Sequence, residues 1–176
     1  MNITSEWIKL DWYECEQAIY IGARRQVEAM RLGFGNKTKH GEKSAIEDHM
    51  QGAGAEKAVG KRLNLDTHFA INTFANGIAD VGEKIEVRWR REQWDLIVRE
   101  KDHDERAYVL VRGEMPEYEI VGWIWGRDAK KPEFWKNPGG HGYAFFVPEK
   151  FLRPISELKV HKVAVGDDPH VAAGSV

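Results

Sequence analysis

The stretch GIADVGEKIEVRWR, residues 77–90, marks the point at which the hydrophobic pattern changes from a helical period to a period of two. It predicts a strand over 77–81 and another over 84–90, separated by a turn. Downstream, the same alternation predicts further strands over 94–100, 106–112, 118–125 and 143–147. The gaps between these segments are typical of the short turns that join antiparallel strands. The second half of the chain is therefore expected to form a sheet.

Helical signals dominate before this stretch. Ser5 is a suitable N-cap for a segment with helix-compatible apolar spacing that extends to about Leu32, as one helix or two. A second helix is expected from Ser44 to about Leu63. Ser44 and Glu47 have the spacing of a capping box, which supports this start.

Two of the predicted strands are apolar on both faces, namely residues 108–111 and 120–125. Such strands belong inside a sheet that is covered on two sides, and the helices are expected to supply the cover. The sequence therefore predicts an α+β fold with a mixed, mostly antiparallel central sheet flanked by helices. We expect an N-terminal helical appendage and basic loop at 1–43, the main domain at 44–165 and a flexible tail at 166–176.

Composition excludes several classes of protein. The 176 residues, 42% of them hydrophobic, suit one globular domain. Cys15 is the only cysteine, so disulfide frameworks and cysteine-based zinc clusters are excluded. No segment approaches the roughly 18 apolar residues of a membrane span, and no apolar signal segment begins the chain, so we expect a cytoplasmic protein. The formal net charge of −2 does not by itself indicate a nucleic-acid binder.

Glu56 is an unusual residue for its position in the second predicted helix. On a helical wheel it lies at the centre of an apolar face whose other members are small or aliphatic: Gly52, Ala53, Val59, Gly60 and Leu63. A carboxylate on such a face requires a cation or strong hydrogen-bond donors. A salt bridge to an arginine of the sheet and a bound metal ion both meet that requirement.

Two more carboxylates, Asp80 and Glu86, flank the first predicted turn of the sheet. Glu86 and Arg88 share one face of their strand, which sets an acid beside a cation. A three-residue turn at 82–84 places Asp80 opposite Glu86, whereas a two-residue turn at 82–83 sends them to opposite faces. Facing carboxylates repel each other and favour a bound metal ion. The candidate site therefore depends on the register of this hairpin.

Taken in order, these segments resemble the PD-(D/E)XK nuclease superfamily, and most of all its small phage-type members. The matching segments are GAGAEKAVG (52–60), IADVG (78–82), IEVRWR (85–90), DLIVRE (95–100) and AYVLVRG (107–113). The resemblance implies a restriction-endonuclease-like fold and metal-dependent hydrolysis of DNA phosphodiester bonds. It also implies action in the host cytoplasm if the chain is phage-encoded.

Carried over residue by residue, the resemblance implies that Glu56, Asp80 and Glu86 hold one or two Mg²⁺ or Mn²⁺ ions. It adds the main-chain carbonyl of Val87 as a further metal ligand. Arg88 completes the implied catalytic set, at a position where the superfamily usually has Lys. Because Arg stays charged at any working pH, Arg88 is suited to stabilising a negatively charged transition state and not to accepting a proton.

Four further residues are candidates for contact with nucleic acid. Lys37, Lys39 and Lys43 lie in a loop rich in Gly and Lys, where they would add salt-dependent affinity for a phosphate backbone. His49 lies two turns before Glu56 on the same helix face, within reach of a substrate phosphate. A solvated loop and a hydrogen-bonded interior histidine are the corresponding structural alternatives.

Two alternatives to a nuclease are consistent with the same residues. One is a catalytically impaired module that keeps the nuclease scaffold and binds nucleic acid or a protein partner, which Arg88 favours. The other is an unrelated α+β protein in which Glu56 and Arg88 form a structural ion pair.

Overall fold

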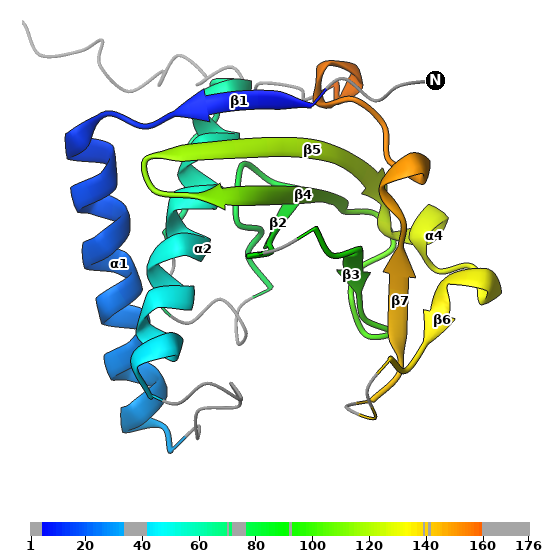
Figure 1. Cartoon of the computed structure of the whole chain (residues 1–176), viewed down its shortest axis with the longest axis horizontal. Helices are drawn as coiled ribbons and strands as arrows, with labels where there is room; N and C mark the ends of the chain where they lie inside the picture. The colour runs from blue at the N-terminus through cyan, green and yellow to red at the C-terminus, as the bar shows by residue number, and fades with distance from the viewer. Residues whose placement is uncertain are drawn as a thin grey trace, which may run out of the picture.

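A computed structural model describes residues 5–33, 42–69, 71, 77–91, 93–138, 140 and 142–159 of the chain (Figure 1). The long helices are α1 (Trp12–Arg31) and α2 (Glu42–Leu63). The strands are β1 (Glu6–Lys9), β2 (Ile85–Trp89), β3 (Leu96–Val98), β4 (Ala107–Glu114), β5 (Glu117–Trp125), β6 (Trp135–Lys136) and β7 (Ala144–Val147). Short helical turns are α4 (Gly126–Ala129), η1 (Pro132–Phe134), η2 (Glu149–Phe151) and η3 (Ile155–Glu157). Within these ranges, no helix is long and apolar enough to cross a membrane.

The central sheet has four strands in the order β1-β5-β4-β2. Its neighbours are antiparallel, except that β2 and β4 run parallel, with Ile85 beside Ala107 and Trp89 beside Val111. The connection between the two parallel strands passes through β3, which belongs to a second sheet. The predicted α+β class, with a mixed and mostly antiparallel sheet flanked by helices, is confirmed.

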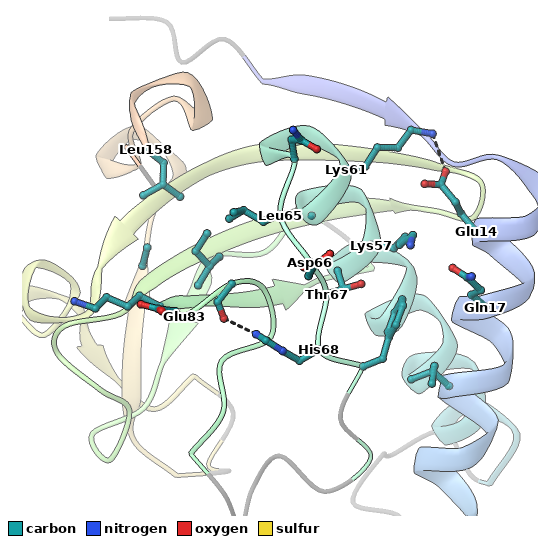
Figure 2. A pocket seen from close by; sticks show the side chains of 18 of the residues that line it. Glu14, Gln17, Lys57, Lys61, Leu65, Asp66, Thr67, His68, Glu83 and Leu158 are labelled. Carbon is teal, nitrogen blue, oxygen red and sulfur yellow. Dashed lines mark hydrogen bonds and ion pairs between the residues drawn. The ribbon is translucent and has the colours of Figure 1, made fainter. Parts of the chain in front are cut away.

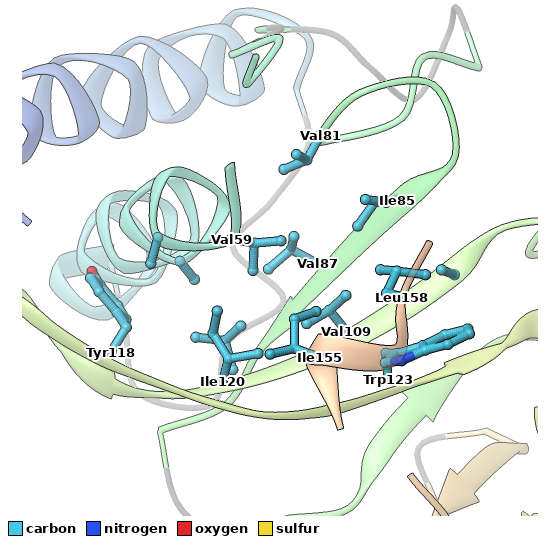
Figure 3. Packing of buried hydrophobic residues seen from close by; sticks show 14 of the residues in the cluster. Val59, Val81, Ile85, Val87, Val109, Tyr118, Ile120, Trp123, Ile155 and Leu158 are labelled. Carbon is cyan, nitrogen blue, oxygen red and sulfur yellow. The ribbon is translucent and has the colours of Figure 1, made fainter. Parts of the chain in front are cut away.

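Different layers cover the two faces of the central sheet. On one face, Val59 of α2 joins a buried cluster that includes Val87 and Val109 (Figure 3). On the other face, Leu96 of the second sheet, whose order is β3-β7-β6, is buried in a cluster with Leu110. The central strands are therefore covered on both sides, as expected. The prediction that helices supply both covers is wrong, because the short apolar strands β3 and β7 form the second layer.

Helix α1 packs along α2, on the side away from the central sheet (Figure 1). The two backbones approach closely at Gly22, where a Cβ atom would lie 2.5 Å from the Cα atom of Met50. At the other end of the pair, Lys61 Nζ donates to Glu14 Oε2 over 2.7 Å. This packing places the side of α1 that carries Arg25 against α2.

The N-terminal segment contains a strand that the sequence pattern did not reveal. Residues 6–9 form β1, which pairs antiparallel with the edge of β5. Helix α1 starts after Asp11, whose backbone amide donates to Glu14 Oε2 over 2.8 Å, so the predicted cap at Ser5 is wrong. The expected helical appendage at 1–43 therefore supplies an edge strand of the central sheet as well as a helix that packs on α2.

Two other local expectations also need correction. Helix α2 begins at Glu42, so Ser44 lies inside it and is not its cap. Residues 77–81 form no strand: only Val81 makes isolated backbone bridges. The backbone pairing with β2 ends at Val81, because the amide of Val87 donates to the side chain of Asp80 and not to a backbone carbonyl.

Candidate active site

The register of the hairpin before β2 decides whether the predicted carboxylates meet. Val81 N donates to Ile85 O over 3.1 Å, and Ile85 N donates back to Val81 O over 3.3 Å. This pair encloses a three-residue turn at 82–84, and Gly82 adopts a φ of +53° that L side chains rarely take. Of the two registers that the sequence left open, the structure therefore has the one that sets Asp80 opposite Glu86.

The outer edge of β2 presents backbone groups beside Asp80. Ala107 N donates to Lys84 O and Arg90 N donates to Val111 O, so the even-numbered residues of this segment bond to β4. Because backbone groups alternate in direction along a strand, the amide and carbonyl of Val87 point away from β4. The Val87 amide donates to Asp80 Oδ2 over 2.8 Å. The Val87 carbonyl therefore points to the same edge as the Asp80 carboxylate, where it accepts from Arg88 Nη1 over 3.5 Å.

Asp80 is the carboxylate whose charge is least compensated at this edge. The pKa of Asp80 is raised from 3.8 to about 7: burial is the largest cause and the nearby charges of Glu56 and Glu86 add to it, against the opposing effects of the Val87 amide and Arg88. Glu56 and Glu86 thus lie close enough to Asp80 to repel it. Asp80 is therefore the residue on which the charges of the other two predicted carboxylates, Glu56 and Glu86, both act.

Asp80→Asn is expected to make the folded protein more stable above pH 7. The unfolded chain releases the Asp80 proton near pH 3.8 and the folded chain near pH 7, so the wild-type free energy of unfolding falls as pH rises between these values. Asn carries no such proton, and the variant therefore gains up to a few kcal/mol over wild type above pH 7, with little difference near pH 4.

Urea unfolding of both proteins across this pH range measures the effect. Asp128→Asn is the control, because Asp128 forms an exposed ion pair with Arg153 at 3.4 Å on another part of the fold. A constant difference between Asp80→Asn and wild type at all pH values would contradict the raised pKa.

Glu86 lies between two arginine side chains. Arg88 Nη1 donates to Glu86 Oε2 over 3.2 Å, and Arg106 Nη1 donates to Glu86 Oε1. Arg88 also donates through Nη2 to Asp102 Oδ2 over 3.1 Å, and its guanidinium lies 5.1 Å from the centre of the Tyr108 ring. Burial opposes the charge of Arg88, but Asp102 and Glu86 keep its pKa above the ordinary value. Two permanent cations therefore flank the predicted metal ligand.

Glu56 forms a buried ion pair with an arginine that the sequence did not single out. Arg25 of α1 donates to both Glu56 oxygens, over 2.7 and 2.8 Å. The two side chains are only 14% and 9% exposed. The cation beside Glu56 is therefore Arg25 of helix α1. It is not an arginine of the sheet, so the predicted pair of Glu56 with Arg88 does not form. A metal ion at Glu56 would have to compete with Arg25 for these two oxygens.

The predicted ligand set is therefore only partly assembled. Across the described ranges, no three His, Cys, Asp or Glu side chains are grouped closely enough to hold a metal ion. Asp80 and the Val87 carbonyl share the β2 edge, with Glu86 opposite Asp80, and arginines hold both Glu56 and Glu86.

The candidate nucleic-acid contacts are mostly beyond what the structure describes. Lys37 and Lys39 lie outside the described residues, and only the backbone of Lys43 is placed, in the first turn of α2. His49 is half-buried on α2. Burial lowers its pKa, and the neighbouring charge of Arg25 lowers it further, which favours a neutral imidazole in the folded protein.

A cavity of about 1280 Å³ lies between the N-terminal half of α1, the end of α2 and the turn before β2 (Figure 2). The side chain of His68 lines this cavity and donates through Nε2 to the Gly82 carbonyl over 2.7 Å. Its lining includes Tyr13, Tyr20, Lys57, Asp66, Thr67, Phe69 and Lys84. The lining contains none of Glu56, Asp80, Glu86 and Arg88, so this cavity is separate from the carboxylate cluster.

Three members of the charged cluster were missed from sequence: Arg25, Asp102 and Arg106. Each forms its ion pair with a residue at least 14 positions away, and surface helices and turns commonly carry such charges. Asp102 had a weak local signal, because its Oδ2 atom also accepts from the Arg99 amide over 2.9 Å and so closes a turn. No pattern within α1 distinguished Arg25 from its exposed neighbour Arg24.

Comparisons of the chain with models of known protein families, with curated proteins and with solved structures found no match.

Proposed function

We propose that this protein is a divalent-metal-dependent nuclease that hydrolyses DNA phosphodiester bonds at the β2 edge. The observation that carries the proposal is the convergence at Asp80: the three-residue turn sets it opposite Glu86, and burial together with two neighbouring carboxylates raises its pKa to about 7. A divalent cation would offset this accumulation of negative charge. The resemblance to PD-(D/E)XK nucleases supports the same proposal, and DNA hydrolysis is consistent with a cytoplasmic location.

The donor chemistry of the edge fits Mg²⁺ or Mn²⁺. Asp80, Glu86 and the Val87 carbonyl offer oxygen ligands of the kind that these ions prefer. Arginines donate to both oxygens of Glu56 and to both oxygens of Glu86, so an ion would compete with guanidinium groups for either carboxylate. When bound, such an ion lowers the pKa of a coordinated water and reduces the negative charge on a phosphate.

The arginines of the site have a separate role. Arg88 and Arg106 carry permanent charges beside Glu86, and a guanidinium binds a phosphate through paired hydrogen bonds. In the proposed function they orient the scissile phosphate and stabilise the charge that develops on it. Asp102 holds the far side of the Arg88 guanidinium and so fixes its direction.

Cleavage of plasmid and linear DNA in the presence of Mg²⁺ or Mn²⁺ tests the proposal. We expect cleavage that depends on the metal and stops when a chelator is added. Conversion of a supercoiled plasmid to the nicked form would identify an internal cut, and shortening of linear DNA alone would identify attack from an end. Absence of any metal-dependent product on both substrates would contradict catalytic activity.

A catalytically impaired module that binds nucleic acid or a protein partner is the second candidate. It is favoured by the arginine ion pairs that occupy Glu56 and Glu86, and by Arg at position 88.

Arg88→Lys separates the two candidates. If the wild type is impaired because Arg cannot accept a proton, the Lys variant should cleave DNA with metal where wild type does not. If wild type is an active nuclease, the same change should slow it, because Lys cannot bind Asp102 and Glu86 at once through a planar fork. Arg127→Lys, in an exposed ion pair with Glu105, is the control and should leave cleavage unchanged.

A further inference from the structure

Helix α1 has a second apolar face, on the side turned away from α2. Trp12, Tyr13, Ile19, Tyr20, Val27 and Met30 are between 44% and 78% exposed. With about 100° between successive residues, they fall within one broad side of the helix. The opposite side carries the buried residues that pack on α2. We call these six residues the outer face of α1.

A solvent-facing side of a helix is normally polar, and a helix that is apolar on two sides is normally covered on both. Figure 1 places α1 as the outermost layer, with α2 between it and the central sheet. Tyr13 and Tyr20, at one margin of the outer face, also line the cavity. Among the residues whose placement is described, none covers Trp12 or Met30.

The outer face is large enough for a stable protein interface. Aromatic side chains bury about 150–250 Å² each when covered, and three of them are more than half exposed here. Together with the three aliphatic side chains, they expose an area of roughly 800 Å², which is about what each partner contributes to an interface of standard size. Exposed apolar patches on monomers are usually smaller than this.

The charges on the outer face suit a second copy of the same helix in the opposite direction. Glu16 is exposed in the first half of α1 and Arg24 in the second half. Arg24 lies at the margin of the outer face, where its Nη1 atom donates to the Tyr20 hydroxyl over 3.4 Å. An antiparallel arrangement sets the first half of one helix beside the second half of the other. Glu16 of each copy then lies near Arg24 of its partner, whereas a parallel arrangement sets like charges together.

We propose that the protein forms a two-fold symmetric dimer through antiparallel packing of the outer faces of two α1 helices. Such an interface is the same patch on both subunits, so each contact occurs twice. The aromatic and aliphatic side chains supply the buried area, and the two Glu16–Arg24 pairs select the direction. This proposal is independent of the proposed nuclease activity, because α1 contributes only Arg25 to the candidate active site and that side chain faces α2.

Sedimentation velocity of the full chain over a dilution series tests the dimer. We expect wild type to sediment with twice the mass of one chain and to dissociate on dilution. Val27→Glu places a charge in the apolar patch and should weaken the dimer at least about 100-fold, a change that a fully desolvated charge readily produces. Gln17→Glu adds the same charge on the same helix, outside the outer face, and should leave the dimer intact.

Charge exchange tests the direction of the two helices. Glu16→Arg alone and Arg24→Glu alone should each weaken self-association, because each sets like charges opposite each other. An equimolar mixture of these two variants should form a mixed dimer, because every pair is then complementary. Circular dichroism and thermal unfolding confirm that each variant is folded.

A wild-type chain that stays monomeric throughout the dilution series would overturn the proposal. So would a dimer that Val27→Glu leaves unchanged, because another surface would then hold the copies together. A mixture of the two charge variants that stays monomeric would overturn the antiparallel arrangement. If Val27→Glu weakens DNA binding of a monomeric wild type, the occupant of the outer face is nucleic acid and the dimer is excluded.

Discussion

Asp80→Asn is expected to reduce metal-dependent DNA cleavage by about 100- to 1,000-fold, the range for removing one preorganised electrostatic group from an active site. The change keeps the size of the side chain and its ability to accept the Val87 amide hydrogen bond, but it removes the negative charge. Initial rates of plasmid cleavage at saturating Mn²⁺ measure the loss.

The same variant should be as stable as wild type or more so, because burial and two neighbouring carboxylates make the Asp80 charge unfavourable in the folded protein. Activity and stability should therefore change in opposite directions, as expected where a protein keeps an unfavourable group for function. Asp128→Asn should change neither property. Wild-type cleavage rates in folded Asp80→Asn would refute a catalytic role for this residue.

Mn²⁺ binding offers a measurement of the site that does not depend on cleavage. A cation that binds only the folded protein raises its unfolding temperature. We expect Mn²⁺ to stabilise wild type and to have little effect on Asp80→Asn. Glu86→Gln is less suitable for this comparison, because it also removes the partner of Arg88 and Arg106 and should destabilise the fold.

Arg25→Met is expected to lower the free energy of unfolding by about 3–5 kcal/mol, because it leaves the buried Glu56 carboxylate without its bidentate partner. Met retains most of the apolar volume of the arginine stem, so the loss reports mainly on the charge. Urea unfolding near neutral pH measures it, where an unpaired carboxylate would be ionised in the unfolded chain.

Arg31→Met provides a matched control on the same helix. Arg31 pairs with Glu28 over 2.6 Å, but the arginine side chain is 66% exposed, so its loss should lower the free energy of unfolding far less than Arg25→Met does. The double variant Arg25→Met, Glu56→Met removes both charges and should recover most of the lost stability. Equal effects of Arg25→Met and Arg31→Met would show that the Arg25–Glu56 pair is not a buried interaction.

The arginine pairs connect these two predictions. Asp80 has two carboxylate neighbours, and each of them is held by arginine: Glu56 by Arg25 and Glu86 by Arg88 and Arg106. A metal ion at the β2 edge therefore competes with guanidinium groups for Glu86. Arg25→Met is informative for this reason, because it releases Glu56 and should increase Mn²⁺ affinity if Glu56 lies within reach of the ion.

The hairpin shows how far local sequence can lead. Its alternation placed Glu86 and Arg88 on one face of a strand, and both side chains do contact each other. The choice between two turn lengths was open from sequence, because Gly82 suits either turn. The paired backbone hydrogen bonds of Val81 and Ile85 settle it, and they depend on the strands around them.

Glu56 shows the opposite case. The helical wheel correctly indicated that its carboxylate is buried and needs a positive partner, because the amphipathic pattern of one helix is a local property. The partner itself is 31 positions away on α1. Its choice depends on the distance between two helices, which Gly22 makes short enough for an arginine to reach across.

Local sequence was enough to predict the class of the fold, most strands after residue 84, helical structure before Leu32 and again up to Leu63, and the burial of Glu56. Each of these follows from periodicity and side-chain chemistry over fewer than about 25 neighbouring residues. Tertiary structure alone decided that residues 6–9 join the sheet, that a second sheet covers its other face and that arginines hold two of the three carboxylates. These outcomes depend on contacts between segments that are far apart in the chain. Such contacts leave no pattern in the sequence of either segment, so they could not be predicted from it.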